Sequence, residues 1–354
     1  MKYLIVKDWY TTHGNHAGMV HMCKLLVEKY SSEYTMLVMP DHKSFMSVDG
    51  NWIYKIAIKV RNRLLKHDYG KLIALHFFFL IFKLKKEDEV FLLEYIEPVA
   101  NQWPLAKMLR KFSKAKRYGL AHQTPTKFDY AGITPQIIKS WSDDVNKILT
   151  FGSSLTAFFV EVGIDSNKIS TGFHFVDRCY YHYVKKENGH PLVVIMMGMT
   201  QRNYRMLASV VEQCDGVKWV ICRGYQQQVD NFFKNFNSVT IKGYLSESEL
   251  KDEMSKADVS ISVMEDTVGS NVITTSMAMG LVNVVSDVGS IRDYCNNDNS
   301  ILCRNTISDF VNAIIFLKDN PNKLEQMRNN AIQAAKQFDI KNVHDWFSSL
   351  RLMD

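Results

Sequence analysis

The sequence predicts an α/β protein with two Rossmann-like domains that face each other across a cleft. Short apolar runs alternate with amphipathic stretches along the chain, a pattern typical of parallel sheets with crossover helices. The length of 354 residues favours two domains, and 46% apolar with 23% charged residues is typical of a globular chain. Residues 163–177 are rich in turn residues and separate two alternating halves. Ligands of such domains bind at the carboxyl ends of the strands.

The first half is expected to form an N-terminal domain over residues 1–180. Each predicted strand is a short run of apolar and β-branched residues bounded by polar or turn residues. A helix is predicted over residues 19–30, and Ser153 and Ser154 are expected to cap a helix that runs to Val162. The predicted strands are Tyr3–Val6, Tyr34–Met39, Glu89–Leu93, Arg117–Ala121 and Lys147–Thr150.

The second half is expected to form a domain over residues 181–340, and residues 341–354 a helix that packs back on the N-terminal domain. The alternation of strands and helices restarts here after the turn-rich stretch. The predicted strands are Pro191–Met197, Lys218–Cys222, Ser238–Ile241, Val259–Val263 and Val282–Ser286. The predicted helices are Tyr204–Gln213, Glu247–Lys256, Val272–Met279, Ile307–Asp319, Pro321–Phe338 and Val343–Leu350.

The stretch from Met264 to Asp293 carries the clearest chemical signal. The side chains of Ser270 and Asn271 can accept hydrogen bonds from the first amides of the helix that follows. Gly280 is a good residue for the end of that helix. Because a glycine or serine loop that opens into a helix concentrates unpaired N–H groups and the positive end of a dipole, it suits a phosphate. The sequence therefore predicts an anion site here, of a kind that suits the phosphates of a nucleotide.

This stretch resembles the donor-site signature of family 4 of the retaining glycosyltransferases, enzymes of the GT-B fold. The matched positions are Ser270-Asn271 on the family's Gly-Asn, residues 276–278 on Ala-Met-Ala, Gly280 on a glycine, and residues 286–291 on Ser-Asp-x-Gly-Gly-Ile. The resemblance covers most of the second half and is looser in the first. It implies a GT-B fold in which the second domain binds a nucleoside diphosphate sugar, with Ser270, Asn271 and Val272 in contact with the donor.

Two positions depart from the family pattern. The acidic residues of the signature, eight positions apart, fall on Thr267 and Thr275. In the family the first glutamate lies near the transferred sugar and the second holds the ribose hydroxyls. A threonine can hydrogen-bond a hydroxyl, but a neutral bond is worth about 1 kcal/mol where a charged one is worth about 1.5–3 kcal/mol. Thr267 and Thr275 are still predicted to contact the donor, while Glu265 and Asp266 lie just upstream and out of register.

A second loop, residues 197–205, occupies the place of the family's phosphate clamp. There two cations hold the diphosphate and stabilise the departing nucleotide. In this sequence Met199 replaces the first cation and Arg202 falls on the second, with a guanidinium that can bind phosphate in bidentate fashion. Arg205, one helical turn further on, can supply the missing charge. The resemblance implies donor contacts from Gly198, Arg202 and Arg205 and a catalytic role for Arg202; the alternative is that the arginines are solvated at a helix start.

Two further candidates lie in the first half. His122 ends a predicted strand in a His-x-x-Pro context, where the family places a histidine that approaches the sugar. The alternative is a histidine that is hydrogen-bonded within a loop. Gly14, in the turn after the first predicted strand, corresponds to the family's early glycine-rich turn beside the phosphates. A strand-to-helix turn also needs glycine for its backbone alone. The resemblance implies a catalytic His122 and a donor contact from Gly14.

The positive charge is confined to the first half. The net charge is +6, with 24 Lys and Arg against 17 Asp and Glu in residues 1–177 and 19 against 20 in the rest. Much of the excess lies in residues 55–86, around an apolar run from Leu72 to Phe82 that is too short to span a bilayer. Either this segment contacts an anionic membrane surface, or it is a core helix with snorkelling lysines at its ends.

Other chemistries find no support in the sequence. The six cysteines show no metal-binding spacing, so we expect free buried thiols, and residues 1–6 are a strand rather than a signal peptide. These features predict a cytoplasmic protein, possibly at the inner face of the membrane. The sequence contains no Walker phosphate-binding loop, no Gly-x-Ser-x-Gly motif of the hydrolases and no known nucleic-acid-binding module. No nucleic acid, metal or cofactor is expected, and the nucleotide sugar is a co-substrate.

The sequence thus predicts a retaining, metal-independent hexosyltransferase. Its expected partners are a nucleoside diphosphate sugar and a glycan or lipid-linked acceptor, in surface polysaccharide biosynthesis. In the family the donor's own β-phosphate oxygen takes the acceptor proton, so no carboxylate base is needed. Two alternatives stay open. One is a non-catalytic partner of another glycosyltransferase, which the two threonines favour, and the other is a sugar-nucleotide 2-epimerase of the same fold, which they disfavour.

Overall fold

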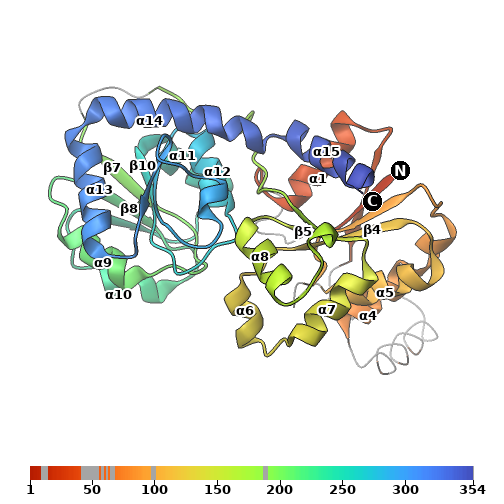
Figure 1. The fold of residues 1–354 in the computed structure, drawn as a ribbon. Helices are drawn as coiled ribbons and strands as arrows, with labels where there is room; N and C mark the ends of the chain where they lie inside the picture. The colour runs from red at the N-terminus through yellow and green to blue at the C-terminus, as the bar shows by residue number, and fades with distance from the viewer. Residues whose placement is uncertain are drawn as a thin grey trace. The chain divides into compact units, whose positions relative to one another are not determined.

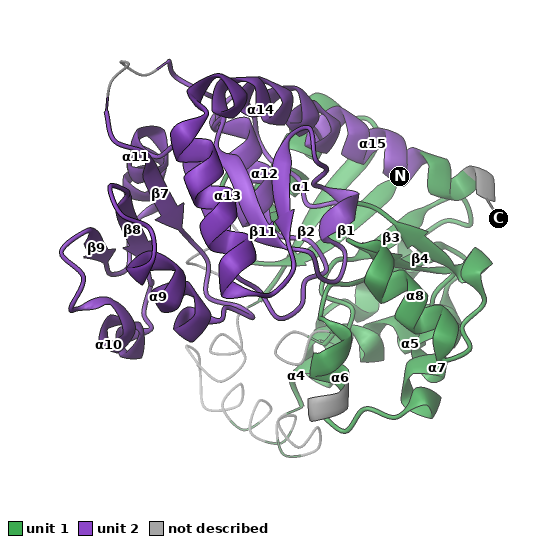
Figure 2. Cartoon of the chain, turned by 60° about the vertical axis from the view of Figure 1, so that its left-hand side comes forward, with its two compact units in different colours: residues 1–172, 349–354 green, residues 173–348 purple. Residues whose placement is uncertain are grey.

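In a computed structural model the chain divides into two compact units (Figure 2). Unit 1 comprises residues 1–172 and 349–354, and unit 2 comprises residues 173–348. The structure describes residues 1–8, 15–40, 56, 60, 63, 68–96, 101–185 and 190–353. Among these residues, no helix combines the length and the apolar composition needed to cross a bilayer.

Unit 1 contains a parallel six-stranded sheet with the strand order β2-β1-β3-β4-β5-β6. Its strands β4 and β5 are labelled in Figure 1. Its strands are β1 (Lys2–Lys7), β2 (Tyr34–Met39), β3 (Glu89–Leu92), β4 (Lys116–Ala121), β5 (Lys147–Thr150) and β6 (Ile169–Thr171). Leu4 is opposite Met36 of β2 on one side and Phe91 of β3 on the other. Because both faces of such a sheet are covered, the central strands are apolar throughout, as the complete burial of Leu4, Ile5 and Phe91 shows.

The helices of unit 1 connect these strands. They are α1 (Met19–Lys29), α4 (Tyr69–His76), α5 (Trp103–Phe112), α6 (Pro125–Tyr130), α7 (Pro135–Asp144) and α8 (Ser153–Glu161), with 3₁₀ turns η1 (Phe78–Phe82) and η2 (Ser166–Lys168) and, at the chain end, η6 (Leu350–Met353). The helix α8 begins at Ser153, and its N-cap residue is Gly152. No side chain caps this helix with a hydrogen bond. The prediction that Ser153 and Ser154 cap this helix is therefore wrong.

Unit 2 contains a second parallel sheet, with the strand order β12-β11-β10-β7-β8-β9. Its strands are β7 (Val193–Met196), β8 (Lys218–Cys222), β9 (Val239–Lys242), β10 (Val259–Ser262), β11 (Val282–Ser286) and β12 (Ser300–Cys303). Its helices are α9 (Tyr204–Glu212), α10 (Asp230–Phe233), α11 (Glu247–Lys256), α12 (Asn271–Ala278), α13 (Ile307–Asp319), α14 (Pro321–Ala334) and α15 (Ile340–Ser349). Short 3₁₀ turns are η3 (Gln227–Val229), η4 (Ile291–Asp293) and η5 (Ala335–Phe338).

The core of unit 2 lies between its sheet and the helices α9, α10 and α13. Alternate strand residues such as Val194, Trp219 and Ile261 point into one cluster with Leu207 of α9 and Phe310 of α13. Since side chains alternate across a strand, the same strands meet α11, α12 and α14 with their other face. The predicted α/β class with two Rossmann-like parallel sheets is confirmed.

Two predictions about the first half need correction. The apolar run from Leu72 to Phe82 is not one core helix, because α4 ends at His76 and the 3₁₀ turn η1 follows. Phe79 and Phe82 in this turn are 73% and 74% exposed. Of the six cysteines, which are all free, five are buried, but Cys179 is exposed. The core-helix alternative for the lysine-flanked apolar run and the burial expected for Cys179 are therefore both wrong.

Candidate functional site

The strand order of unit 2 reverses between β7 and β10. Open α/β sheets bind ligands where the order reverses, at the carboxyl ends of the strands. The loops after these two strands are joined by an isolated antiparallel bridge between Arg202 and Met264. The Asn203 amide donates to the Val263 carbonyl and the Glu265 amide to the Gln201 carbonyl, both at 3.0 Å. The two loops therefore form one connected surface at the reversal point.

Gly198 brings three of the predicted donor-binding residues together. Its φ of +79° lies in the left-handed region that favours glycine. A Cβ atom at this position would lie 3.0 Å from Nη2 of Arg202 and 3.1 Å from Cγ2 of Val272. The β7–α9 loop, the Arg202 guanidinium and the first turn of α12 are thus in close contact, and a side chain at position 198 would separate them.

Arg202 is a largely buried cation. Its Nε and Nη2 donate to the Met197 carbonyl at 3.3 and 3.2 Å, and Nη1 donates to the Thr200 carbonyl at 3.2 Å. Within the described ranges, no carboxylate lies within ion-pair distance of this guanidinium. Burial lowers the pKa of Arg202 to about 10, so the side chain still carries its charge at neutral pH. A desolvated charge without a counter-ion is unfavourable, and an anionic ligand would relieve it.

The N-terminus of α12 lies beside this cation, as the contact of Val272 with the Gly198 position shows. Ser270 is the N-cap residue, and its Oγ accepts a hydrogen bond from the Val272 amide at 3.2 Å. The prediction of Ser270 as the cap is therefore confirmed, while Asn271 is the first, exposed residue of the helix. The amides of a helix start and a guanidinium form a suitable pair of groups for a phosphate.

The two threonines in place of the family glutamates are buried and bond to nearby backbone. Thr275 Oγ1 donates to the Asn271 carbonyl at 2.7 Å, one turn back in α12. Thr267 Oγ1 donates to the Gly269 carbonyl at 3.2 Å and accepts from the Gly269 amide at 3.1 Å. Each hydroxyl thus stabilises its own local backbone. Upstream, Glu265 is exposed.

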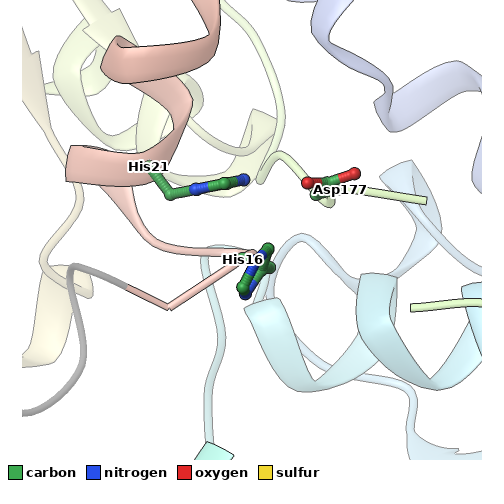
Figure 3. A group of neighbouring side chains, drawn as sticks. All are labelled: His16, His21 and Asp177. Atoms are coloured by element: carbon green, nitrogen blue, oxygen red, sulfur yellow. The ribbon is translucent and has the colours of Figure 1, made fainter. Parts of the chain in front are cut away.

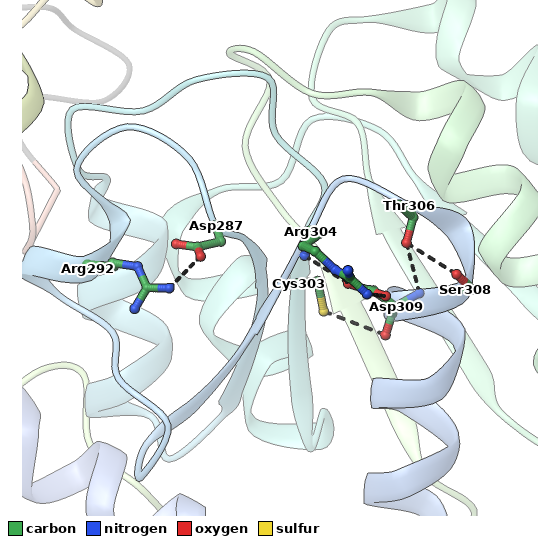
Figure 4. Close-up of polar contacts among 7 residues, drawn as sticks. All are labelled: Asp287, Arg292, Cys303, Arg304, Thr306, Ser308 and Asp309. Carbon is green, nitrogen blue, oxygen red and sulfur yellow. Dashed lines mark hydrogen bonds and ion pairs between the residues drawn. The ribbon is translucent and has the colours of Figure 1, made fainter.

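Two other arginines at this edge of the sheet are paired, in contrast to Arg202 (Figure 4). Arg292 lies 2.5 Å from the Asp287 carboxylate that follows β11, and Arg304 donates to Asp309 at 2.8 and 3.1 Å. The Arg304 guanidinium holds the pKa of the Asp309 carboxyl below its usual value. The carboxylates of Asp287 and Asp309 neutralise Arg292 and Arg304. Of these three arginines, Arg202 is therefore the one whose charge is available to an anionic ligand.

A polar network fixes the strand ends around the site. The Met264 amide donates to Ser286 Oγ at 2.7 Å, Ser286 Oγ donates to Asn305 Oδ1 at 2.5 Å, and Asn305 Nδ2 donates to the Met264 carbonyl at 2.8 Å. This closed network joins the carboxyl ends of β10, β11 and β12. The loop that leads to α12 is therefore held at its base.

Arg205 differs from Arg202 in that its side chain is exposed to solvent. It is the second residue of α9, whose N-cap Asn203 accepts from the Met206 amide at 2.9 Å. The Arg205 side chain is exposed, and no ion pair involves it in the part of the chain that the structure describes. Its predicted donor contact stays a prediction.

Sequence reasoning missed an aromatic pair at the same edge of the sheet. Tyr225 follows β8 and Tyr244 follows β9, and their rings are stacked with centroids 4.5 Å apart and an interplanar angle of 14°. Both are exposed, at 63% and 48%. Burial of large aromatic surface is favourable, so an exposed stacked pair offers a flat surface for a ring. Their positions directly after two predicted strands were the signal that could have identified them.

In unit 1 the described candidate residue, His122, lies at the carboxyl end of β4. Gly14 lies outside the described residues. His16 precedes α1 and His21 lies in it, and the centroids of their rings are 4.4 Å apart (Figure 3). Asp177, which Figure 3 also draws, belongs to unit 2. His122 directly follows β4 and is half-buried, with its ring 6.3 Å from that of Phe151 after β5. Sequence reasoning also missed Glu94, a buried acid just beyond β3.

Two Rossmann-like units with parallel six-stranded sheets define a class, the GT-B fold, and solved structures share it along the whole chain. HepE of Anabaena, solved in complex with UDP and glucose, has a TM-score of 0.70 at 12% identity and covers 99% of this chain and 98% of its own. A glycosyltransferase from Rickettsia africae has a TM-score of 0.70 at 14% identity, with the same coverage. Sucrose-phosphate synthase from Thermosynechococcus elongatus has 0.70 at 11% identity and covers 100% of both chains.

A family model matches the second unit. Residues 191–320 are similar to the family described as Glycosyl transferases group 1. It contains the reversal point, Arg202 and α12. No curated protein sequence matches the chain.

Proposed function

We propose that the protein is a retaining, metal-independent glycosyltransferase that moves a hexose-type sugar from a nucleoside diphosphate sugar to a glycan or lipid-linked acceptor. Unit 2 binds the donor, and unit 1, with the excess positive charge, binds the acceptor. The proposed setting is surface polysaccharide biosynthesis in the cytoplasm. The family match of residues 191–320 supports the reaction class, and HepE, with the same fold, was solved with UDP-glucose.

One observation carries this proposal: a largely buried Arg202 without a carboxylate partner among the described residues, placed beside the start of α12. A pyrophosphate would supply two negative charges where the fold supplies a guanidinium and the positive end of the α12 helix dipole. The stacked Tyr225 and Tyr244 at the same edge of the sheet would receive the nucleobase. Aromatic stacking of a base contributes about 1–3 kcal/mol.

In the proposed reaction the bond between the sugar's anomeric carbon and the diphosphate oxygen breaks. A bond from the same carbon to the acceptor hydroxyl oxygen forms on the same face, and the hydroxyl proton passes to the β-phosphate oxygen. Negative charge grows on the leaving diphosphate in the transition state. Arg202 and the α12 amides are fixed before the reaction and stabilise that charge. His122 would lie near the sugar.

The test is substitution of Arg202. Arg202→Ala should reduce kcat/KM by roughly 30- to 900-fold, since removing one preorganised donor costs about 2–4 kcal/mol in the transition state. Arg202→Lys keeps the charge but loses the bidentate geometry and should fall between. Arg205→Ala is the matched control, because an exposed arginine three residues beyond the bridge residue Arg202 should have a smaller effect. An Arg202→Ala enzyme within threefold of the parent would refute the role.

A second candidate function is a non-catalytic partner of another glycosyltransferase. The observation that favours it is the local bonding of Thr267 and Thr275, whose hydroxyls bond to their own backbone where the family has carboxylates. Both candidates bind a nucleoside diphosphate, so a thermal-shift screen against UDP, GDP, ADP and dTDP sugars identifies the base for either. Release of the nucleoside diphosphate only when an acceptor is present separates the enzyme from the non-catalytic protein.

A further inference from the structure

An apolar patch lies on unit 1, away from the residues assigned to donor binding. In η1, Phe79 and Phe82 are the two most exposed large apolar side chains of the described residues, at 73% and 74%. Leu75 at the end of α4 and Phe78 are also exposed, at 49% and 37%. The ring centroids of Phe78, Phe79 and Phe82 lie 5.7, 5.8 and 6.5 Å apart. These three side chains therefore form one surface.

The rings of the patch contact each other more than they contact the protein interior. Phe78 lies 5.7 Å from Phe82 and 5.8 Å from Phe79 between ring centroids, both with nearly perpendicular planes. Beneath them, Leu80 and Ile81 are buried and anchor the turn. The 3₁₀ turn thus buries Leu80 and Ile81 and leaves the three phenylalanine rings on the outside.

The patch continues onto the neighbouring helix α5. This helix packs against both α4 and η1, and α4 and α5 lie side by side in Figure 1. Phe112, the last residue of α5, is 55% exposed. The turns that follow η1 and α5 are joined by a hydrogen bond from the Lys116 amide to the Asp88 carbonyl at 3.0 Å. Both turns lead into amino ends of strands, β3 and β4, whereas His122 lies at the opposite, carboxyl end of β4.

Exposed lysines surround the patch. The five side chains in these two turns and at the end of α5 are Lys83, Lys85, Lys86, Lys111 and Lys114. Across the described part of the chain, none of these ammonium groups has a carboxylate within ion-pair distance. Of the acids in the same turns, Asp88 is buried and bonded to the N-terminal amine at 3.0 Å, which leaves Glu87 as the exposed one. An apolar centre with a cationic rim is complementary to one surface in particular, an anionic lipid bilayer.

We propose that unit 1 docks on the surface of an anionic membrane through this patch, with Phe79 and Phe82 inserted among the acyl chains and the lysines on the headgroups. The inference does not rest on the proposed glycosyl transfer, because binding to vesicles is measured without any donor or acceptor. If both hold, the patch keeps the carboxyl ends of the unit 1 strands, where His122 lies, away from the lipid.

The experiment is co-sedimentation of the full chain with vesicles of phosphatidylcholine, with and without one-third phosphatidylglycerol. The parent should bind the anionic vesicles and should dissociate at high ionic strength, because salt screens the lysines. Phe79→Ser with Phe82→Ser should weaken partitioning by about tenfold or more, as two buried rings are lost. Replacement of Lys83, Lys85 and Lys86 by Gln should weaken it roughly 100-fold, since each lysine near the surface contributes about fivefold.

Matched controls lie on unit 2. Phe316 is an exposed phenylalanine at 43%, so Phe316→Ser tests the loss of any exposed ring. Replacement of the exposed Lys218, Lys234 and Lys336 by Gln tests the loss of three charges. Neither control should change vesicle binding by more than twofold. A Phe79→Trp variant should show a blue-shifted emission on binding anionic vesicles, and a Phe316→Trp variant should not.

Three outcomes would overturn the proposal. The first is that the parent protein fails to bind anionic vesicles, and the second is that the patch variants and the control variants lose binding equally. The third is that sedimentation velocity without lipid shows a dimer which Phe79→Ser with Phe82→Ser converts to a monomer, since the patch is then a contact between copies of the chain. Equal thermal midpoints of the parent and the variants establish that each variant is folded.

Discussion

At the scale of single residues, position 198 combines a left-handed backbone with two close neighbours from the candidate site. Its φ of +79° favours glycine, and a Cβ atom there would lie 3.0 Å from the Arg202 guanidinium and 3.1 Å from Val272, so that these groups would have to shift. We predict that Gly198→Ala lowers the free energy of unfolding by about 1–2 kcal/mol from the backbone conformation. It should also weaken nucleoside diphosphate binding at least tenfold, because the new methyl group separates the cation from α12. Urea unfolding and calorimetric titration measure the two effects.

Gly216 provides a matched control for this substitution. It has a similar φ of +72°, and no atom lies within 4 Å of a Cβ built on it. Gly216→Ala should therefore show the backbone cost with unchanged nucleotide affinity. Equal losses of affinity in the two variants would mean that the contacts at position 198 do not shape the site.

A second residue-scale prediction concerns a buried ion pair in unit 2. Arg328 Nη2 lies 3.2 Å from the Asp258 carboxylate, and Nη1 donates to the Gly280 carbonyl at 2.8 Å. Arg328 and Asp258 are 4% and 3% exposed. Arg328→Met should lower the free energy of unfolding by about 3–5 kcal/mol, because it removes the guanidinium that is paired with a buried carboxylate. Arg304→Met, at an exposed pair, should cost less than about 1 kcal/mol in the same urea titration.

At the scale of elements, the start of α12 is expected to serve both stability and binding. Ser270→Ala removes the side-chain cap and should cost about 1 kcal/mol. Thr306→Ala removes the corresponding cap of α13, where Oγ1 accepts from the Asp309 amide at 3.2 Å, at a similar cost. Only the Ser270 variant should also lose nucleotide affinity, because only α12 begins beside Arg202. If Thr306→Ala weakens binding as much, global destabilisation explains both.

Most elements could be predicted from sequence because their patterns were unambiguous. The apolar runs of β2, β5, β8 and β11 were predicted with the bounds that the structure has. Two edge strands were missed: β6 and β12 are short and partly exposed, so they lack the continuous apolar run that marks a central strand. The sequence did not separate α4 from the turn η1, because an apolar run of helical length does not reveal where the helix axis breaks.

At the scale of the whole molecule, the thiols report on the integrity of both units. Five cysteines are buried, and burial raises the pKa of Cys214 to about 11 and those of Cys222, Cys295 and Cys303 to about 12. Because the thiolate is the reactive form, we predict that a thiol reagent titrates Cys179 alone at neutral pH and all six in denaturant. The Cys179→Ser variant is the control, and it should show no fast reaction.

The candidate site was predictable where it depends on local sequence and unpredictable where it depends on pairing between distant loops. Ser270 as the N-cap followed from its place before a helix. The absence of a carboxylate near Arg202 among the described residues, and the pairing of Arg292 and Arg304 with Asp287 and Asp309, depend on which loops the strand order brings together. The stacking of Tyr225 on Tyr244 likewise requires β8 and β9 to be neighbours, which the sequence does not state.

The closed network of Met264, Ser286 and Asn305 has a consequence for recognition. Since three strand termini are held by mutual hydrogen bonds, the approach to α12 is ordered before any ligand arrives, and capture of a nucleotide should require little loss of chain entropy. Amide exchange around Met264 should then be slow in the empty protein and barely slower in the occupied one. In Ser286→Ala the same amides should exchange quickly until nucleotide is added, because the ligand would then have to supply the order that the network provides.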